Sequence, residues 1–208
     1  MTKKKITALT PAIVKELEPG RNSAIFNTET ALYEERVIIF DQEVTTESAN
    51  CLQNQLQYLA MQSNEKITIY IDSPGGSVVA GLAMLDTMMI LEKRGIVIET
   101  ICRGMAASMA SLLLMCGSKG HRFMMTNSTC MVHDLSGGTH GKYADMDVDF
   151  QFSTALRKKL INIVAKRTGK SEADVESKWF DRIDHFMNWD EAKKEGIIDD
   201  VIEANYDL

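Results

Sequence analysis

Residues 67–115 of this chain, ITIYIDSPGGSVVAGLAMLDTMMILEKRGIVIETICRGMAASMASLLLM, contain the pattern that decides the fold. The stretch begins with a strand-like run at residues 67–71 and the turn Ser73-Pro74-Gly75-Gly76, and it continues with helical spacing over residues 78–91. A second strand-like run at residues 96–102 leads into another apolar helix. Strands that alternate with helices predict a parallel sheet with helical crossovers, so we expect an α/β fold.

The same alternation continues on both sides of this stretch. A buried-strand pattern and a helical pattern precede it, and further strand and helix signals follow it, at residues 37–40, 46–61, 121–125, 129–132, 143–167, 171–174 and 189–195. These elements predict a single domain over residues 31–208. Residues 1–30 mix charges, prolines and Asn/Thr clusters without a sustained period, which predicts an irregular N-terminal arm.

Composition narrows the class of protein. The 208 residues are 45% hydrophobic and 25% charged, which suits one globular domain with a sizeable core. The net charge is −6 and the only dense basic run is Lys3-Lys4-Lys5, so we expect no nucleic-acid partner. No stretch approaches the roughly 18 apolar residues that span a bilayer, so we expect no membrane partner and a cytoplasmic location.

The cysteines predict neither a disulfide framework nor a metal site. None forms a CxxC pair and none has a histidine at metal-ligand spacing, so we interpret all four as small reduced core residues: Cys51, Cys102, Cys116 and Cys130. The segment Gly117-Ser118-Lys119-Gly120 lacks the full phosphate-binding pattern. We therefore expect no cofactor and no metal in this chain.

Ser108 is the candidate nucleophile. It lies in Gly104-Met105-Ala106-Ala107-Ser108-Met109, where a strand turns into an apolar helix among mostly small residues. The first N–H groups of a helix have no intrahelical partner and stabilise negative charge, and small neighbours let a substrate approach. The alternative interpretation is that Ser108 is a small packing residue.

A serine hydroxyl needs a base beside it, and His133 is the best candidate of the four histidines. It ends the strand pattern at residues 129–132, and sites assemble where parallel strands end. A third group, a carboxylate, must orient the imidazole. Chemistry alone does not rank the candidate acids, which are Asp147, Asp181, Asp184 and Asp190. The two glycines of Ser73-Pro74-Gly75-Gly76-Ser77 suit an oxyanion hole, although an ordinary turn has the same composition.

Three motifs together resemble the ClpP family, the proteolytic subunit of the ATP-dependent Clp protease. They are Ser73-Pro74-Gly75-Gly76, the serine segment around Ser108, and Met131-Val132-His133 followed by Gly137-Gly138, and the resemblance covers roughly residues 35–205. It implies a serine endopeptidase in which Ser108 is the nucleophile and His133 the general base, with an oxyanion hole formed by the N–H groups of Gly76 and Met109.

The resemblance also implies Asp184 as the orienting acid. Counting back from Glu191-Ala192 puts Asp184 in register, whereas counting forward from Thr168-Gly169 falls two residues short and leaves Asp181 as the second candidate. The chain departs from the family pattern at Met105, where glutamine is usual, at Asp134-Leu135, where Gln-Pro is common, in a longer turn at residues 92–95, and in the arm before Tyr33.

The family fold is a crotonase-like β-α superhelical domain with a protruding strand-helix handle, here at about residues 134–168. The resemblance implies heptameric rings that stack through the handle into a tetradecamer, fed with unfolded polypeptides by an AAA+ unfoldase that uses the ATP. A helical stripe suits burial against another subunit or against this chain's own core, at Phe152, Leu156, Leu160, Ile163 and Val164.

Two other function classes have the same motifs. A phage-type maturation protease or an inactive ClpP-like subunit is the nearer alternative, suggested by the unusual arm. A crotonase-fold enzyme that acts on an acyl-CoA is the other, but it predicts carboxylates near the oxyanion donors, and residues 75–85 contain none.

Overall fold

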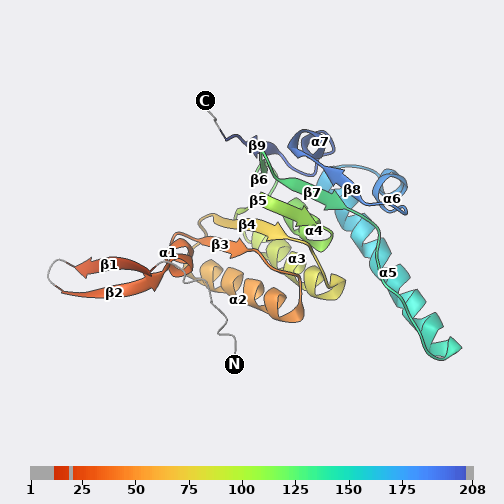
Figure 1. Cartoon of the computed structure of the whole chain (residues 1–208), viewed down its shortest axis with the longest axis horizontal. Coiled ribbons are helices and arrows are strands. Elements are labelled where there is room, and N and C mark those ends of the chain that lie inside the picture. Colours follow the sequence, from red (N-terminus) through yellow and green to blue (C-terminus); the bar gives the residue numbers. More distant parts are fainter. Residues whose placement is uncertain (1–11, 19–20, 205–208) are drawn as a thin grey trace, which may run out of the picture.

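A computed structural model describes residues 12–18 and 21–204 of the chain. Its main sheet has the strand order β3-β4-β5-β6-β9, with β7 paired to β5 and β8 paired to β7 (Figure 1). The strands are β3 (Val37–Phe40), β4 (Ile67–Ser73), β5 (Ile98–Ala107), β6 (Arg122–Met125), β7 (Thr129–Val132), β8 (His185–Met187) and β9 (Asp200–Ile202). All pairs are parallel except β7 with β8. The predicted α/β fold is confirmed.

Strand β5 divides the sheet. Its first half pairs with β6, at Thr100 to Cys102, and its last residues pair with β7, at Met105 to Ala107. Along its length β5 therefore pairs first with β6 and then with β7. As a result β7 and then β8 lie beside the carboxyl end of β5, where the chain turns into the next helix.

The helices are α1 (Thr28–Glu34), α2 (Thr46–Gln62), α3 (Val78–Lys93), α4 (Met109–Met115), α5 (Tyr143–Thr168), α6 (Glu172–Trp179) and α7 (Trp189–Lys194). Helix α2 begins with a capping box of Thr45 and Ser48, which satisfies backbone N–H groups at its start. Its predicted apolar stripe is buried in the core at Ala49, Leu52, Leu56 and Leu59. Helices α2 and α3 lie together on one face of the sheet (Figure 1).

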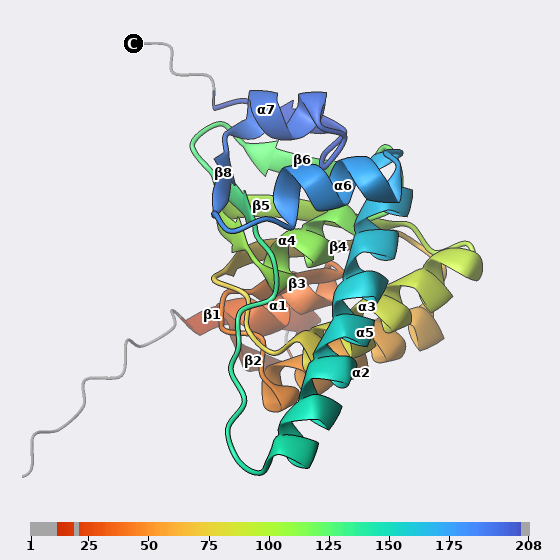
Figure 2. The same cartoon turned by 90° about the vertical axis from the view of Figure 1, so that its right-hand side faces the viewer.

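Helix α5 extends well beyond the body of the domain (Figures 1 and 2). Only its second half is buried, through Leu160, Ile161, Val164 and Ala165, so that part of the predicted stripe packs on this chain's own core. The first half exposes large apolar side chains at Tyr143, Val148, Phe150 and Phe152.

Residues 133–142 run beside α5 as extended chain, in the segment that connects β7 to the helix (Figure 2). The structure differs here from the prediction of a strand in the handle, because these residues pair with no strand in the described part of the chain. A strand needs a hydrogen-bonding neighbour, which a glycine-rich segment beside a helix lacks.

The arm predicted as irregular over residues 1–30 contains a two-stranded antiparallel ribbon, so that prediction is wrong where the structure describes it. Strand β1 (Ala12–Glu18) pairs with β2 (Arg21–Asn27), and the ribbon projects from the domain next to α1 (Figure 1). The charged residues in both strands obscure a two-residue period, so the sequence did not indicate the pairing. Residues 1–11 and 19–20 lie outside the described residues.

Three of the four cysteines are buried as expected, but Cys51 is exposed on α2, beside rather than within its apolar stripe. That part of the cysteine prediction is wrong. No helix in the described ranges combines the length and the apolar composition needed to cross a membrane.

Candidate active site

Ser108 lies at a sharp turn from strand to helix. Strand β5 ends at Ala107 and α4 begins at Met109, and Ser108 between them has φ 54° and ψ −125°. Positive φ is uncommon for any residue other than glycine, and such a conformation persists only when its surroundings hold it. One restraint is the hydrogen bond from the Ser108 N–H to the Met131 carbonyl on β7, at 2.9 Å. This turn projects the hydroxyl beyond the end of the sheet.

His133 follows directly after β7. Because Ala107 of β5 pairs with Met131 of β7, the two parallel strands end side by side. The His133 Nε2 atom is 2.9 Å from the Ser108 Oγ atom. The sheet thus brings together two residues that are 25 positions apart in the sequence.

Asp184 directly precedes β8. The antiparallel pairing of Val132 with His185 places Asp184 across from His133, one step beyond the end of both strands. Its Oδ1 atom is 3.1 Å from the His133 Nδ1 atom. The Asp184 side chain is 54% exposed and the His133 side chain 22% exposed, so solvent reaches the carboxylate more readily than the imidazole.

The other candidate acids have different partners. Asp181 accepts hydrogen bonds from His185 Nε2 at 2.8 Å and from the Ile183 N–H at 3.1 Å, and the bond from His185 lowers the pKa of its carboxyl group. Asp190 forms an ion pair with Lys194, and Asp147 accepts a hydrogen bond from Gln151. The structure therefore places Asp184, and none of these three, against His133.

The other histidines also lie elsewhere. His121 is 3.6 Å from Glu99 at the start of β6, and His185 is paired with Asp181. His140 is exposed in the glycine-rich segment before α5.

The loop Ser73-Pro74-Gly75-Gly76-Ser77 lies against the serine turn. A side chain on Gly75 would place its Cβ atom 2.7 Å from Ser108 Cβ and 2.9 Å from the Met109 nitrogen, so only glycine allows this approach. Gly76 has φ +144° and forms a bridge with Val44. Among the described residues, the N–H groups of Gly76 and Met109 donate to no protein acceptor. Both remain available to bind an oxyanion.

A groove of about 380 Å³ continues from this point along the handle. Val78, next to the glycine loop, and Leu135, two residues after His133, line it together with Phe150, Phe152 and Leu156 of α5. Its apolar side chains suit an extended polypeptide with apolar side chains.

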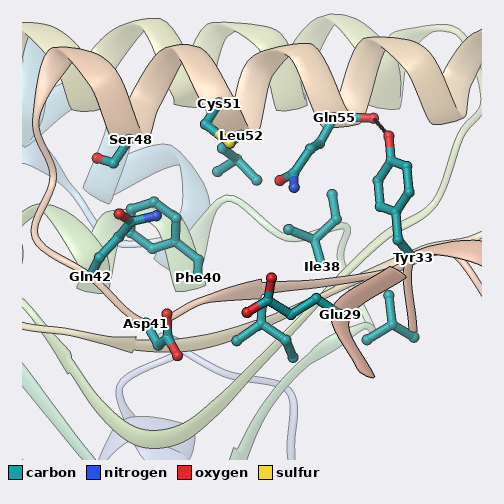
Figure 3. A pocket seen from close by; sticks show the side chains of 12 residues that line it. Glu29, Tyr33, Ile38, Phe40, Asp41, Gln42, Ser48, Cys51, Leu52 and Gln55 are labelled. Carbon is teal, nitrogen blue, oxygen red and sulfur yellow. Dashed lines mark hydrogen bonds between the residues drawn. The ribbon is translucent and has the colours of Figure 1, made fainter. Parts of the chain in front are cut away.

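A separate cavity of about 180 Å³ lies between β3 and α2 (Figure 3). Tyr33 closes one end, where its hydroxyl donates to the Gln55 carbonyl at 3.1 Å. Cys51 also lines this cavity, whereas Ser108 and His133 do not.

Two contributors to the site escaped the reasoning from sequence. The close fit of Gly75 against Ser108 was not predicted, although the pair of glycines indicated a special backbone. Arg157 on α5 contacts Asp134 and the Phe180 carbonyl, but no local signal in the sequence distinguishes it from the neighbouring Lys158 and Lys159.

Serine hydrolases on α/β sheets have a serine at a strand-to-helix turn. Its hydroxyl is hydrogen-bonded to an imidazole, and the imidazole is hydrogen-bonded to a carboxylate, as in this chain. The family model described as Clp protease matches residues 20–205 of the chain. The chain belongs to the Clp protease family and is a ClpP-like serine peptidase. The predicted membership is confirmed.

Proposed function

We propose that this chain is a serine endopeptidase with Ser108 as nucleophile, His133 as general base and Asp184 as orienting acid. The observation that carries the proposal is the continuous run of hydrogen-bond distances, 2.9 Å from Ser108 Oγ to His133 Nε2 and 3.1 Å from His133 Nδ1 to Asp184 Oδ1. In this run the Nδ1–H donates to Asp184, which leaves Nε2 free to accept the serine proton.

The reaction then has two stages. Oγ of Ser108 attacks the peptide carbonyl carbon while His133 Nε2 takes the hydroxyl proton, and the N–H groups of Gly76 and Met109 bind the resulting oxyanion. His133 gives its proton to the amine nitrogen as the C–N bond breaks, which leaves an ester on Ser108. Water, deprotonated by His133, attacks that ester, and the acid product leaves with the serine restored.

The surroundings of Asp184 favour it over Asp181 as the acid. Asp181 is already bonded to His185 and to the Ile183 N–H, so it would have to break two hydrogen bonds to reach another imidazole. Asp184 is bonded to His133 directly.

Unfolded polypeptides are the proposed substrates, delivered by an AAA+ unfoldase that supplies all ATP chemistry, with no cofactor in this chain. The apolar groove between Val78, the segment that begins at Leu135 and the handle helix supports an extended peptide, because its first lining residues follow the glycine loop and His133 closely in the chain. Exposed apolar residues on the first half of α5, at Tyr143, Val148, Phe150 and Phe152, support assembly through the handle into heptameric rings and a tetradecamer.

The test combines a fluorophosphonate probe with a fluorogenic short peptide. We expect Ser108→Ala to abolish labelling and turnover, Asp184→Asn to lower kcat by about 10⁴-fold, and Asp181→Asn to retain far more activity. An assembled wild-type protein that the probe does not label would refute the serine mechanism. Equal losses in the two aspartate variants would remove the assignment of the acid.

Assembly has its own test. Light scattering of a Phe150→Ser, Phe152→Ser variant should give a lower molar mass than wild type, with Ala155→Ser as control on the same exposed helix. An unchanged mass would show that these residues do not hold the assembly together.

A further inference from the structure

Arg157 lies in the middle of α5, and all three nitrogen atoms of its guanidinium group donate hydrogen bonds. Its Nε atom donates to both carboxylate oxygens of Asp134, at 2.9 and 2.8 Å, and its Nη1 atom donates to Glu176 of α6. Its Nη2 atom donates to the carbonyl oxygen of Phe180, at 2.7 Å, and the guanidinium carbon lies 5.7 Å from the centre of the Phe180 ring. Arg157 thus links three segments of the chain, which are its own helix α5, the residue after His133, and the C-terminal part of α6.

Two of these segments carry the residues of the site. Asp134 is bonded covalently to His133, so the ion pair with Arg157 holds the backbone directly after the imidazole. Phe180 ends α6 four residues before Asp184 and is itself buried. Arg157 therefore holds one end of the short segment that carries the carboxylate.

The other end of that segment is already held. His185 pairs with Val132 in the sheet, and between the two ends Asp181 bonds to Ile183 and His185. A segment of four residues anchored in this way has little freedom once Phe180 is anchored too. The position of Asp184 relative to His133 then depends on the contact at Phe180.

We infer that Arg157 is a positioning residue for the reaction. From the handle helix it fixes the segment after His133 and the segment before Asp184 relative to each other, and this fixes the distance between the imidazole and the carboxylate. It touches neither the substrate nor the reacting atoms. The inference rests on the proposed serine-peptidase function and deepens it.

Only arginine suits this position. A planar guanidinium presents N–H donors in several fixed directions, whereas a lysine ammonium is a single point charge that cannot bond Asp134, Glu176 and the Phe180 carbonyl in the same geometry. The hydrogen bonds that Arg157 donates to Glu176 and then to Asp134 raise the pKa of its guanidinium group, so the side chain stays charged. It also pairs with Asp134, which is 25% exposed and would otherwise be a half-buried carboxylate without an ion-pair partner.

The kinetics separate positioning from mere stability. A displacement of Asp184 relative to His133 lowers the rate of the chemical step for every folded molecule and leaves peptide binding unchanged. A general loss of stability lowers only the fraction of folded protein, so kcat per site labelled by the probe stays the same.

The experiment compares Arg157→Met and Arg157→Lys with Arg167→Met in the assembled protein. Arg167 is a matched control because it lies on the same helix and donates to Glu92 at 2.9 Å, on α3 rather than on either segment of the site. Each variant is assayed for molar mass, for KM and for kcat per labelled site on the short peptide, and for the rate of labelling by the fluorophosphonate.

We expect Arg157→Met to lower kcat and the labelling rate by about 10- to 100-fold with KM little changed, as for a displacement of about 1 Å. Arg157→Lys should fall between Arg157→Met and wild type, and Arg167→Met should retain wild-type kcat. If Arg157→Met does not assemble, Arg157→Lys against Arg167→Lys makes the same comparison.

Wild-type kcat per labelled site and a wild-type labelling rate in assembled Arg157→Met and Arg157→Lys would overturn the inference. So would an equal loss in Arg167→Met. Neither result would affect the proposed function, which fails instead if wild-type activity survives Ser108→Ala or is absent from the assembled protein; in that case the inference fails with it.

Discussion

Replacing Gly75 by alanine should disable the site while leaving its polar residues intact. The new Cβ atom would lie 2.5 Å from the Ala107 carbonyl oxygen, 2.7 Å from Ser108 Cβ and 2.9 Å from the Met109 nitrogen. All three contacts belong to the turn that carries the nucleophile. Either the glycine loop or the serine turn must therefore move.

The size of the movement follows from these distances. Two carbon atoms settle at about 3.5–4.0 Å, so relief of the contact with Ser108 needs a shift of about 1 Å. A misplacement of that size costs about 10²-fold in rate. Gly75 also has φ +89°, which adds about 1–2 kcal/mol of backbone strain for any residue with a side chain.

Gly95→Ala separates the two effects. Gly95 has φ +86° in the turn after α3, and a Cβ atom there would meet nothing within 4 Å. Both variants should lose about 1–2 kcal/mol or more of unfolding free energy in urea at one protein concentration. Only Gly75→Ala should also lose about 10²-fold in kcat/KM on the short peptide. Equal activity in the two variants would refute the close fit of the glycine loop to Ser108.

The remaining predictions concern stability and exposure. Asp199→Asn should lower the unfolding free energy in urea by about 3–5 kcal/mol, because it removes the negative charge that pairs with Arg122, which is only 1% exposed. An effect below about 1 kcal/mol would contradict this prediction. The same pair lowers the pKa of the Asp199 carboxyl below its ordinary value of 3.8, despite the opposing effect of burial, so its stabilisation is present above that pH and is lost as the pH falls further. Wild type should therefore lose more stability than Asp199→Asn on acidification, as a urea series against pH would show. A maleimide should add to Cys51 alone in the native protein, because burial of the other three thiols raises their pKa, to about 11 for Cys102. The intact mass after a short incubation checks this prediction. More than one rapid addition would contradict it.

Most helices and strands were predictable because their signals are local. The two-residue period of a strand, the helical stripe of α2 and the Pro-Gly-Gly turn are each contained in fewer than about twenty residues. The same local signals marked Ser108 at a strand-to-helix turn and His133 at a strand end. The resemblance to a known family added Asp184, and residue chemistry alone left it level with three other aspartates.

The N-terminal ribbon and the extended part of the handle show where local signals fail. The pairing of β1 with β2 depends on two segments meeting, and charged residues mask its period. In the handle, the segment for which the family resemblance implied a strand finds no neighbour within the described chain and remains unpaired. In both cases a partner decides whether a strand forms, and a partner is not a property of the segment itself.

By itself the sequence determined the order of the strands and helices from β3 to α7, apart from β8, and the placement of Ser108 and His133 at strand ends, because hydrophobic period and turn composition are read along the chain. Only the tertiary structure decided which carboxylate meets His133, 51 residues away, since a three-residue strand, β8, has too short a period to reveal its register. The fit of Gly75 to Ser108 and the contacts of Arg157 belong to the same class. They depend on distances between segments, which strand pairing and helix packing determine after the chain has folded.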